Sequence, residues 1–176
     1  MTDAPIFDSD AWRLTDQERQ LTTQARELGE TRFADRASRY DREAKFPIEN
    51  YRDFHDAGLL GICIPSKYDG HGANLRAYAL TAAEVGRYCG STALTWNMHV
   101  CSCLWSGTMA DDLEMDRAVR ERHHETRRVH YRRILDDGAI YSQPFSEGGS
   151  AAAGTVAFST TAVRCDGGWV IRGKKI

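Results

Sequence analysis

The sequence lacks a long apolar run, an excess of basic charge and a secretion signal. None of its apolar stretches approaches the ~18 residues of a membrane-spanning helix, and residues 1–10 are acidic, without a basic start or an apolar middle. The net charge of the 176 residues is −2 at pH 7, whereas nucleic-acid-binding domains are usually basic. These absences argue against a membrane span and a nucleic-acid partner, and a cytoplasmic location is expected.

Cysteine is present, but never in a metal-binding pair. The five cysteines stand at positions 63, 89, 101, 103 and 165, with no C-x-x-C pair and one left over from any pairing. This spacing argues against a disulfide framework or a four-cysteine zinc site and favours small buried thiols. Residues 124–128 begin like the H-E-x-x-H zinc motif, but Arg128 replaces the second histidine. No metal ligand is therefore predicted.

A series of helical patterns occupies most of the first 136 residues. Thr15 and Glu18 have the capping-box spacing, and the apolar residues that follow predict one amphipathic helix from 15 to about 45. A second, short helix is expected after Pro47, with Ile48, Tyr51 and Phe54 turned inward and Gly58 as its left-handed cap. The composition, 41% hydrophobic and 27% charged, is that of a globular protein.

Two further helices are expected after Asn74 and after Ser91, each of which is a good N-cap residue. Both helices are predicted to be largely buried. The side chains expected to face the core are Leu75, Tyr78, Ala82, Val85, Leu94, Met98, Cys101, Leu104 and Trp105.

A fifth helix is expected from about 112 to 135. It is acidic at its start and arginine-rich towards its end, as the helix dipole favours. Its arginines are interspersed with acids, so a surface or inter-subunit face is a better interpretation than a phosphate grip. His123, His124 and His130 are predicted to be solvated residues of this helix.

The pattern changes to strand near residue 137. Strands are predicted at 139–143, 160–165 and 168–172, the last two joined by Asp166-Gly167, which is typical of a type I′ turn. Two or three strands cannot bury a core by themselves, and the natural protein is therefore expected to continue past Ile176. A P-loop-like spacing at 168–175 has Lys175 in place of the magnesium-binding hydroxyl and is set aside.

Residues 141–150 form the segment with the most chemistry, Tyr-Ser-Gln-Pro-Phe-Ser-Glu-Gly-Gly-Ser. Exposed backbone N–H groups and the hydroxyls of Ser142, Ser146 and Ser150 can hydrogen-bond a pyrophosphate or the polar edge of a flavin. A flexible connection is the alternative interpretation of the same residues.

Four elements, in the same order, resemble the acyl-CoA dehydrogenase family. The family's G-L-x-G-x-x-x-P…G-G-x-G element is similar to residues 56–65 followed by 69–72, and its E…S-T-A-L helices are similar to residues 84–94. Its Y-x-x-T-E-P-x-x-G-S flavin loop falls at 141–150, and its T-x-A…G-x-x-x-x-G-x-K hairpin at 161–175. The resemblance covers nearly the whole chain.

This resemblance implies a mainly α fold. An N-terminal α-helical bundle domain (1–136) is followed by the first strands of an incomplete β-barrel domain (137–176). The resemblance implies FAD as the cofactor and a homo-oligomer as the complete protein. It also implies the family's reaction in fatty acid metabolism, the oxidation of acyl-CoA to 2-enoyl-CoA. In that reaction a glutamate is the base, and an electron-transfer flavoprotein accepts the electrons. The chain alone is expected to be inactive, because the family's base lies in its C-terminal helical bundle.

The implied cofactor contacts are Tyr141, Ser142, Gln143, Gly149 and Ser150, with Ser150 also touching the substrate. The family's T-E-P matches either residues 142–144, with two extra residues afterwards, or residues 144–146 without gaps. Gly149-Ser150 is the same in both alignments, and Ala151 stands where the family usually has aspartate. Glu147 is not at the position of the base, so no catalytic residue is expected. The alternatives are a flavin-dependent monooxygenase of the same fold and a non-catalytic helical module.

Overall fold

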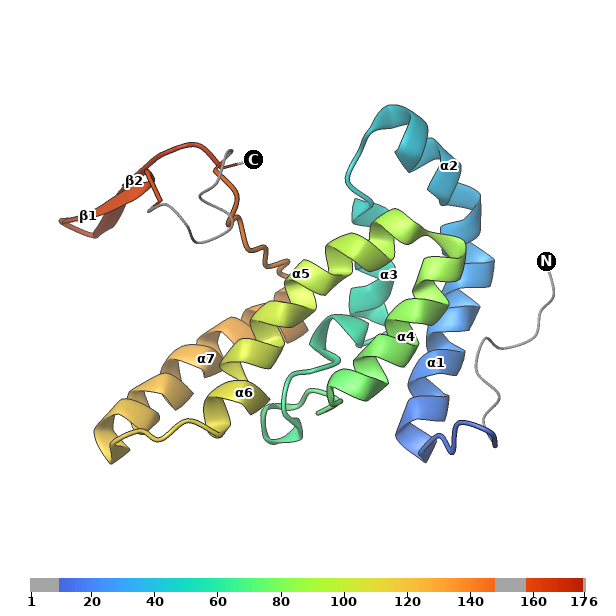
Figure 1. Cartoon of the computed structure of the whole chain (residues 1–176), viewed down its shortest axis with the longest axis horizontal. Coiled ribbons are helices and arrows are strands. Elements are labelled where there is room, and N and C mark those ends of the chain that lie inside the picture. The colour runs from blue at the N-terminus through green and yellow to red at the C-terminus, as the bar shows by residue number, and fades with distance from the viewer. Residues whose placement is uncertain (1–9, 148–157, 176) are drawn as a thin grey trace. The chain divides into compact units, whose positions relative to one another are not determined.

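A nearly continuous series of helices makes up the first part of the protein. The computed structural model describes residues 10–147 and 158–175, which fall into two compact units divided between Tyr141 and Ser142. Figure 1 shows the helical unit in blue to orange. Its helices are α1 (Asp16–Leu28), α2 (Ala34–Glu43), α3 (Ile48–Asp56), α4 (Leu75–Tyr88), α5 (Gly90–Ser106), α6 (Thr108–Asp111) and α7 (Arg117–Asp137), with a π-turn (Gly29–Phe33) and 3-10 turns (Leu59–Gly61 and Ser66–Tyr68).

The predicted capping box starts α1. The Glu18 amide donates to the Thr15 hydroxyl (3.2 Å), and the Thr15 amide donates to the Glu18 carboxylate (2.8 Å). The predicted helix from 15 to 45 is interrupted by the π-turn Gly29–Phe33 and ends at Ala44, which has left-handed backbone angles. The expected left-handed conformation of Gly58 is confirmed at φ 74°.

The core lies where α1, α3, α4 and α5 meet over the apolar turn at 59–64. Phe54 of α3 stacks on Trp96 of α5 with ring centroids 4.5 Å apart, and Phe33 meets Phe54 edge to face at 5.2 Å. Helix α4 packs between α1 and α5 (Figure 1). The buried apolar side chains of these elements give the helical unit its own core.

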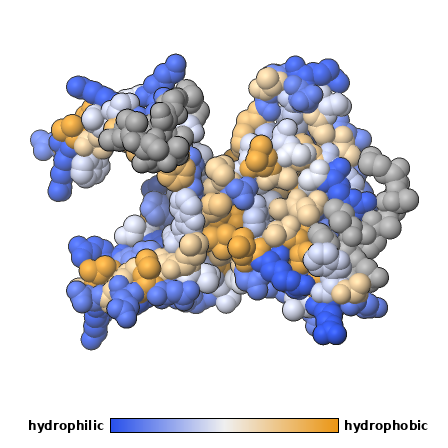
Figure 2. Space-filling view, in the orientation of Figure 1, coloured by the Kyte–Doolittle hydropathy of each residue, from blue (hydrophilic) through white to orange (hydrophobic). Residues whose placement is uncertain are grey.

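Several side chains predicted to face the core are on the surface instead. Leu75 is 65% exposed and Leu94 is 72% exposed, and Ile48, Met98 and Trp105 are exposed as well. Helix α5 is apolar almost all round, but its neighbours cover only the face that carries Trp96 and Val100. Apolar side chains therefore remain on the surface of the helical unit, as Figure 2 shows. Helix α5 also begins two residues earlier than predicted, with Cys89 rather than Ser91 as N-cap.

Helix α7 begins at Arg117 rather than near 112 and docks through a polar cluster. The prediction that all its arginines lie on the surface is wrong for Arg127, whose side chain is 1% exposed. Arg127 donates to Asp111 (2.6 Å), to the Ser106 carbonyl (2.8 Å) and to the Tyr68 hydroxyl (3.1 Å). Burial opposes the charge, but these bonds raise the pKa of Arg127 above its ordinary value. A fully hydrogen-bonded guanidinium thus adds to the apolar contacts that α7 makes through Tyr131 and Ile134.

Two of the three α7 histidines are not solvated as predicted. His123 and His124 are half-buried, and the Nδ1 atom of His124 lies 2.8 Å from the Tyr68 hydroxyl and 2.7 Å from Arg127. Of the five cysteines, Cys63, Cys89 and Cys103 are buried as predicted, whereas Cys101 is half-buried and Cys165 exposed.

The second unit contains an antiparallel hairpin of β1 (Thr161–Cys165) and β2 (Gly168–Arg172), as predicted. Val163 pairs with Val170, and all ten strand residues are exposed. The turn is not type I′, because Gly167 has a positive φ (80°) but Asp166 does not. The predicted strand at 139–143 is wrong: within the described residues the segment pairs with no strand, and the Tyr141 amide bonds to a side chain of α5.

A mainly helical chain with one two-stranded antiparallel sheet in its described part confirms the predicted fold class. No helix among the described residues is both long and apolar enough to cross a membrane.

Candidate functional site

The predicted cofactor segment begins at Tyr141, the last residue of the helical unit. The Tyr141 amide donates to Nδ1 of His99 on α5 (3.1 Å), and the Tyr141 hydroxyl lies 2.7 Å from Nδ1 of His130 on α7. The His130 and Tyr141 rings meet edge to face, with centroids 5.5 Å apart. Both ends of Tyr141 are therefore held by histidines from two different helices.

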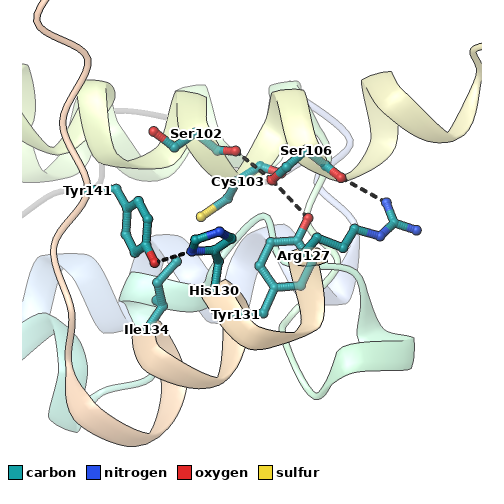
Figure 3. A pocket seen from close by; sticks show the side chains of 8 residues that line it. All are labelled: Ser102, Cys103, Ser106, Arg127, His130, Tyr131, Ile134 and Tyr141. Carbon is teal, nitrogen blue, oxygen red and sulfur yellow. Dashed lines mark hydrogen bonds between the residues drawn. The ribbon is translucent and has the colours of Figure 1, made fainter. Parts of the chain in front are cut away.

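The Tyr141 ring also closes one end of a cavity of about 200 Å³ between α5 and α7, here called the α5–α7 cavity. Figure 3 shows Ser102, Cys103 and Ser106 of α5 on one side of it, and His130, Tyr131 and Ile134 of α7 on the other. Arg127 completes the lining. The hydroxyls of Ser106 and Tyr131 lie 3.1 Å apart and bond to each other, so they leave mainly carbon surface facing the cavity.

The titratable groups of the α5–α7 cavity are not set up as nucleophiles. Burial raises the pKa of Cys103 to about 12, which keeps its thiol protonated at neutral pH. Burial also raises the pKa of Tyr131. The Arg127 guanidinium is engaged by Asp111 and by main-chain carbonyls. Such a cavity suits an uncharged, apolar group better than a phosphate or a metal ion.

The residues that follow Tyr141 belong to the second unit. Ser142 is exposed, and neither its amide nor its hydroxyl has a hydrogen-bond partner among the described residues. Gln143 is half-buried, and its carbonyl accepts from the Phe145 amide (2.9 Å). Of the five predicted cofactor contacts, Gly149 and Ser150 lie outside the described residues.

Glu147 is fixed in an ion pair. Its side chain is only 4% exposed, and its carboxylate lies 2.6 Å from the Lys175 ammonium. The amides of Ser159 (2.6 Å) and Thr160 (3.1 Å) also donate to it. The hydrogen bond from Lys175 is the largest cause that holds the pKa of Glu147 far below its usual range. A carboxylate that is so firmly ionised is a poor proton acceptor, which agrees with assigning no catalytic role to it.

The donor set of this segment suits a flavin. The free amide and hydroxyl of Ser142 are neutral donors of the kind that the carbonyl-rich edge of an isoalloxazine ring accepts from. The α5–α7 cavity next to Tyr141 offers aromatic and aliphatic surface. Within the described part of the chain, no group of three or more histidine, cysteine or acidic side chains is arranged to hold a metal ion.

Sequence reasoning missed His99, His130 and the α5–α7 cavity. His99 is 42 residues from Tyr141, and only the packing of α5 brings the two together. His130 is 11 residues away, in a helix whose histidines gave no metal or catalytic spacing. The one sequence signal for His99 was its position between the apolar residues Met98 and Val100 of a helix that was expected to be largely buried.

The sequence places the protein in a known family. The family model described as "Acyl-CoA dehydrogenase, N-terminal domain" matches residues 15–110, which is more than half of the chain. The chain belongs to the acyl-CoA dehydrogenase family, as the order of its sequence elements predicted.

Individual relatives are distant. The chain is 31% identical over 85 residues to the probable acyl-CoA dehydrogenase YngJ of Bacillus subtilis, a match that covers 48% of this chain and 22% of the relative. It is 29% identical over 162 residues to the benzylmalonyl-CoA dehydrogenase of Aromatoleum aromaticum, covering 92% of this chain and 40% of the relative.

A nitrososynthase from Micromonospora carbonacea var. africana shares the fold, with a TM-score of 0.72 and 21% identity over 93% of this chain and 38% of that one. The chain thus spans less than half the length of these relatives.

Proposed function

We propose that this chain contributes the helical wall and the first cofactor-contacting segment of an FAD-dependent acyl-CoA dehydrogenase. The observation that carries the proposal is the position of Tyr141. It begins the segment that resembles the family's flavin loop, and its ring lines the α5–α7 cavity. Membership of the family supports FAD as the cofactor and an acyl-CoA thioester as the substrate.

The chain's own residues would bind and orient. Ser142 and Gln143 would donate to the polar edge of the flavin, and Gly149 and Ser150 would contact the flavin, with Ser150 also meeting the substrate. FAD, when bound, supplies the acceptor for the hydride that leaves the acyl β-carbon. The carbon-lined α5–α7 cavity of the helical unit would take up an uncharged, apolar group.

The wider function follows from the family alone and is part of the proposal. The complete protein would act in fatty acid metabolism as a cytoplasmic homo-oligomer, passing electrons to an electron-transfer flavoprotein. The two sequence relatives named above are a probable acyl-CoA dehydrogenase and a benzylmalonyl-CoA dehydrogenase, which supports this choice. A flavin-dependent monooxygenase is the second candidate, because the nitrososynthase has the same fold.

Nuclear magnetic resonance of the ¹⁵N-labelled chain tests the cofactor proposal. Since the chain covers only part of a dehydrogenase, we expect weak binding and a colourless purified protein. Titration with millimolar FAD should shift the amides of Tyr141, Ser142 and Gln143 while leaving the far side of α1 unchanged. AMP, which lacks the isoalloxazine ring, is the matched control and should not shift them. Equal shifts with both ligands, or none with FAD, would refute the proposal.

A further inference from the structure

The imidazole of His99 joins three segments that are distant in the sequence. It projects from the middle of α5 and is fully buried. Its Nε2 atom lies 3.0 Å from the carbonyl oxygen of Leu60, in the 3-10 turn, and its Nδ1 atom lies 3.1 Å from the amide nitrogen of Tyr141. The ring therefore bridges a buried turn to the residue at which the candidate cofactor segment begins.

The two partners fix the tautomer of the ring. A backbone N–H can only donate, so Nδ1 of His99 must accept from Tyr141. Nε2 then carries the hydrogen and donates to Leu60. Burial lowers the pKa of His99, which keeps this neutral form at physiological pH. Both ring nitrogens are satisfied, and protonation of Nδ1 would break the bond to Tyr141.

The main chain is held just before this point as well. Gly138 ends α7 in a left-handed conformation (φ 66°), and the amides of Gly138 and Ala139 both donate to the Arg133 carbonyl. His130 contacts the Tyr141 hydroxyl at 2.7 Å. Among the described residues, the backbone of Tyr141 has His99 as its hydrogen-bond partner, so this bond holds the main chain where it continues beyond the helix cap.

We propose that His99 is a positioning residue for the cofactor segment, because its imidazole fixes the main chain of Tyr141 against α5 and the buried Leu60 turn. The inference rests on the proposed function, in which residues from Tyr141 onward meet the flavin. A preorganised segment loses less conformational entropy when the ligand binds.

Two substitutions separate the two bonds of the ring. In His99→Asn, the side-chain oxygen lies near the former Nδ1 and still accepts from Tyr141, but the donor to Leu60 is lost. In His99→Gln, the side-chain nitrogen lies near the former Nε2 and still donates to Leu60, but the acceptor for Tyr141 is lost. Each variant removes one hydrogen bond from the same buried site, so each is a control for the other's loss of stability.

Amide hydrogen exchange is the first measurement and needs no ligand. Exchange at Tyr141 should be roughly three- to tenfold faster in His99→Gln than in His99→Asn, after normalisation to Val85 in the core of α4. If His99 had a purely structural role, the exchange rates of the Tyr141 and Val85 amides would rise by the same factor in each variant. That result would overturn the inference. The wild-type tautomer is a further check if a variant fails to fold. Long-range ¹H–¹⁵N spectra should show hydrogen on Nε2, and hydrogen on Nδ1 would equally overturn the inference.

Titration with FAD separates this inference from the proposed function. The FAD-induced shifts at Ser142 and Gln143 should be retained in His99→Asn and should require several-fold more FAD in His99→Gln. Equal titration of both variants would refute the positioning role and leave the cofactor proposal intact. No shift in the wild type would refute the cofactor proposal, while the exchange result for Tyr141 would still stand.

Discussion

At the scale of single residues, the backbone of Ala44 is the clearest departure from sequence preference. Ala44 follows α2 with φ 48° and ψ 42°, and its amide donates to the carbonyls of Tyr40 and Asp41. Glycine usually occupies this left-handed position after a helix, because a Cβ atom crowds the neighbouring carbonyl. The sequence ends α2 with a residue that the conformation disfavours.

Replacing Ala44 by glycine should therefore stabilise the protein. The strain relieved is about 1–2 kcal/mol, and the added freedom of the unfolded chain costs about 0.4–1 kcal/mol. The free energy of unfolding in urea should rise by roughly 0.5–1 kcal/mol. The control is Ala34→Gly at the start of α2, where the backbone is right-handed (φ −56°) and glycine should cost about 1 kcal/mol. Destabilisation by both changes would contradict this account of Ala44.

At the scale of elements, the contact between the π-turn after α1 and helix α4 depends on the absence of a side chain at Gly29. Gly29 begins the π-turn, and the aromatic ring of Tyr88, at the end of α4, packs directly over it. A Cβ atom at position 29 would overlap this ring. The Tyr88 hydroxyl donates to Glu30 (3.0 Å), which holds the ring in place.

Gly29→Ala should lower the free energy of unfolding by about 1–3 kcal/mol, because a rigid ring has to move. Helix propensity alone predicts the opposite, a gain of up to about 1 kcal/mol. Urea denaturation distinguishes the two signs. The double variant Gly29→Ala, Tyr88→Ala removes the overlap, and alanine at 29 should then no longer destabilise relative to Tyr88→Ala alone. An equal loss with and without the ring would show that the cause lies elsewhere in the π-turn.

At the scale of the whole molecule, three buried or half-buried histidines link folding to pH. Burial lowers the pKa of His99 and of His71, and burial together with the charges of Arg127 and Lys67 lowers the pKa of His124. The unfolded chain takes up protons at these residues near pH 6.5, before the folded protein does. Their contribution to stability is complete above about pH 6.5 and is lost as the pH falls through the lower folded values.

The free energy of unfolding should thus decrease between about pH 7 and pH 5. The lowered pKa values of Glu18 and Asp111 act in the same direction, but only below the ordinary pKa values of these groups, 4.5 and 3.8. His124→Asn keeps an acceptor for Tyr68 and Arg127 without a titrating group, and its stability should depend less steeply on pH. Urea titrations at several pH values measure both slopes. A wild-type stability that is constant over this interval would contradict the linkage.

The two units should also differ in protection. The strands β1 and β2 pair only with each other among the described residues, and all their side chains are exposed. An isolated two-stranded hairpin is marginally stable in water. Its amides should exchange with solvent orders of magnitude faster than those of α4 and α5. Comparable protection in a monomer would show that the hairpin is covered.

The sequence by itself determined the caps and turns that depend on residues close to one another along the chain. The capping box at Thr15 and Glu18, the N-cap at Asn74, the positive φ of Gly58 and the β1–β2 hairpin all depend on residues a few positions apart. The family could also be predicted, because the order of four short elements is preserved along the chain. Which side of α5 is buried was predicted only in part, because Leu104 is buried but Leu94 and Met98 are exposed, and the face that the neighbouring helices cover carries Trp96 and Val100.

Tertiary structure alone decided the course of the chain after α7. The predicted strand at 139–143 satisfies strand propensity, yet it has no strand partner in the described part of the chain, and the Tyr141 amide bonds to His99 instead. The buried position of Arg127 likewise depends on Asp111 and Tyr68, which come from other elements. Propensities and caps are fixed by neighbours in sequence, whereas a buried polar group is stable only where folding brings its partners to it.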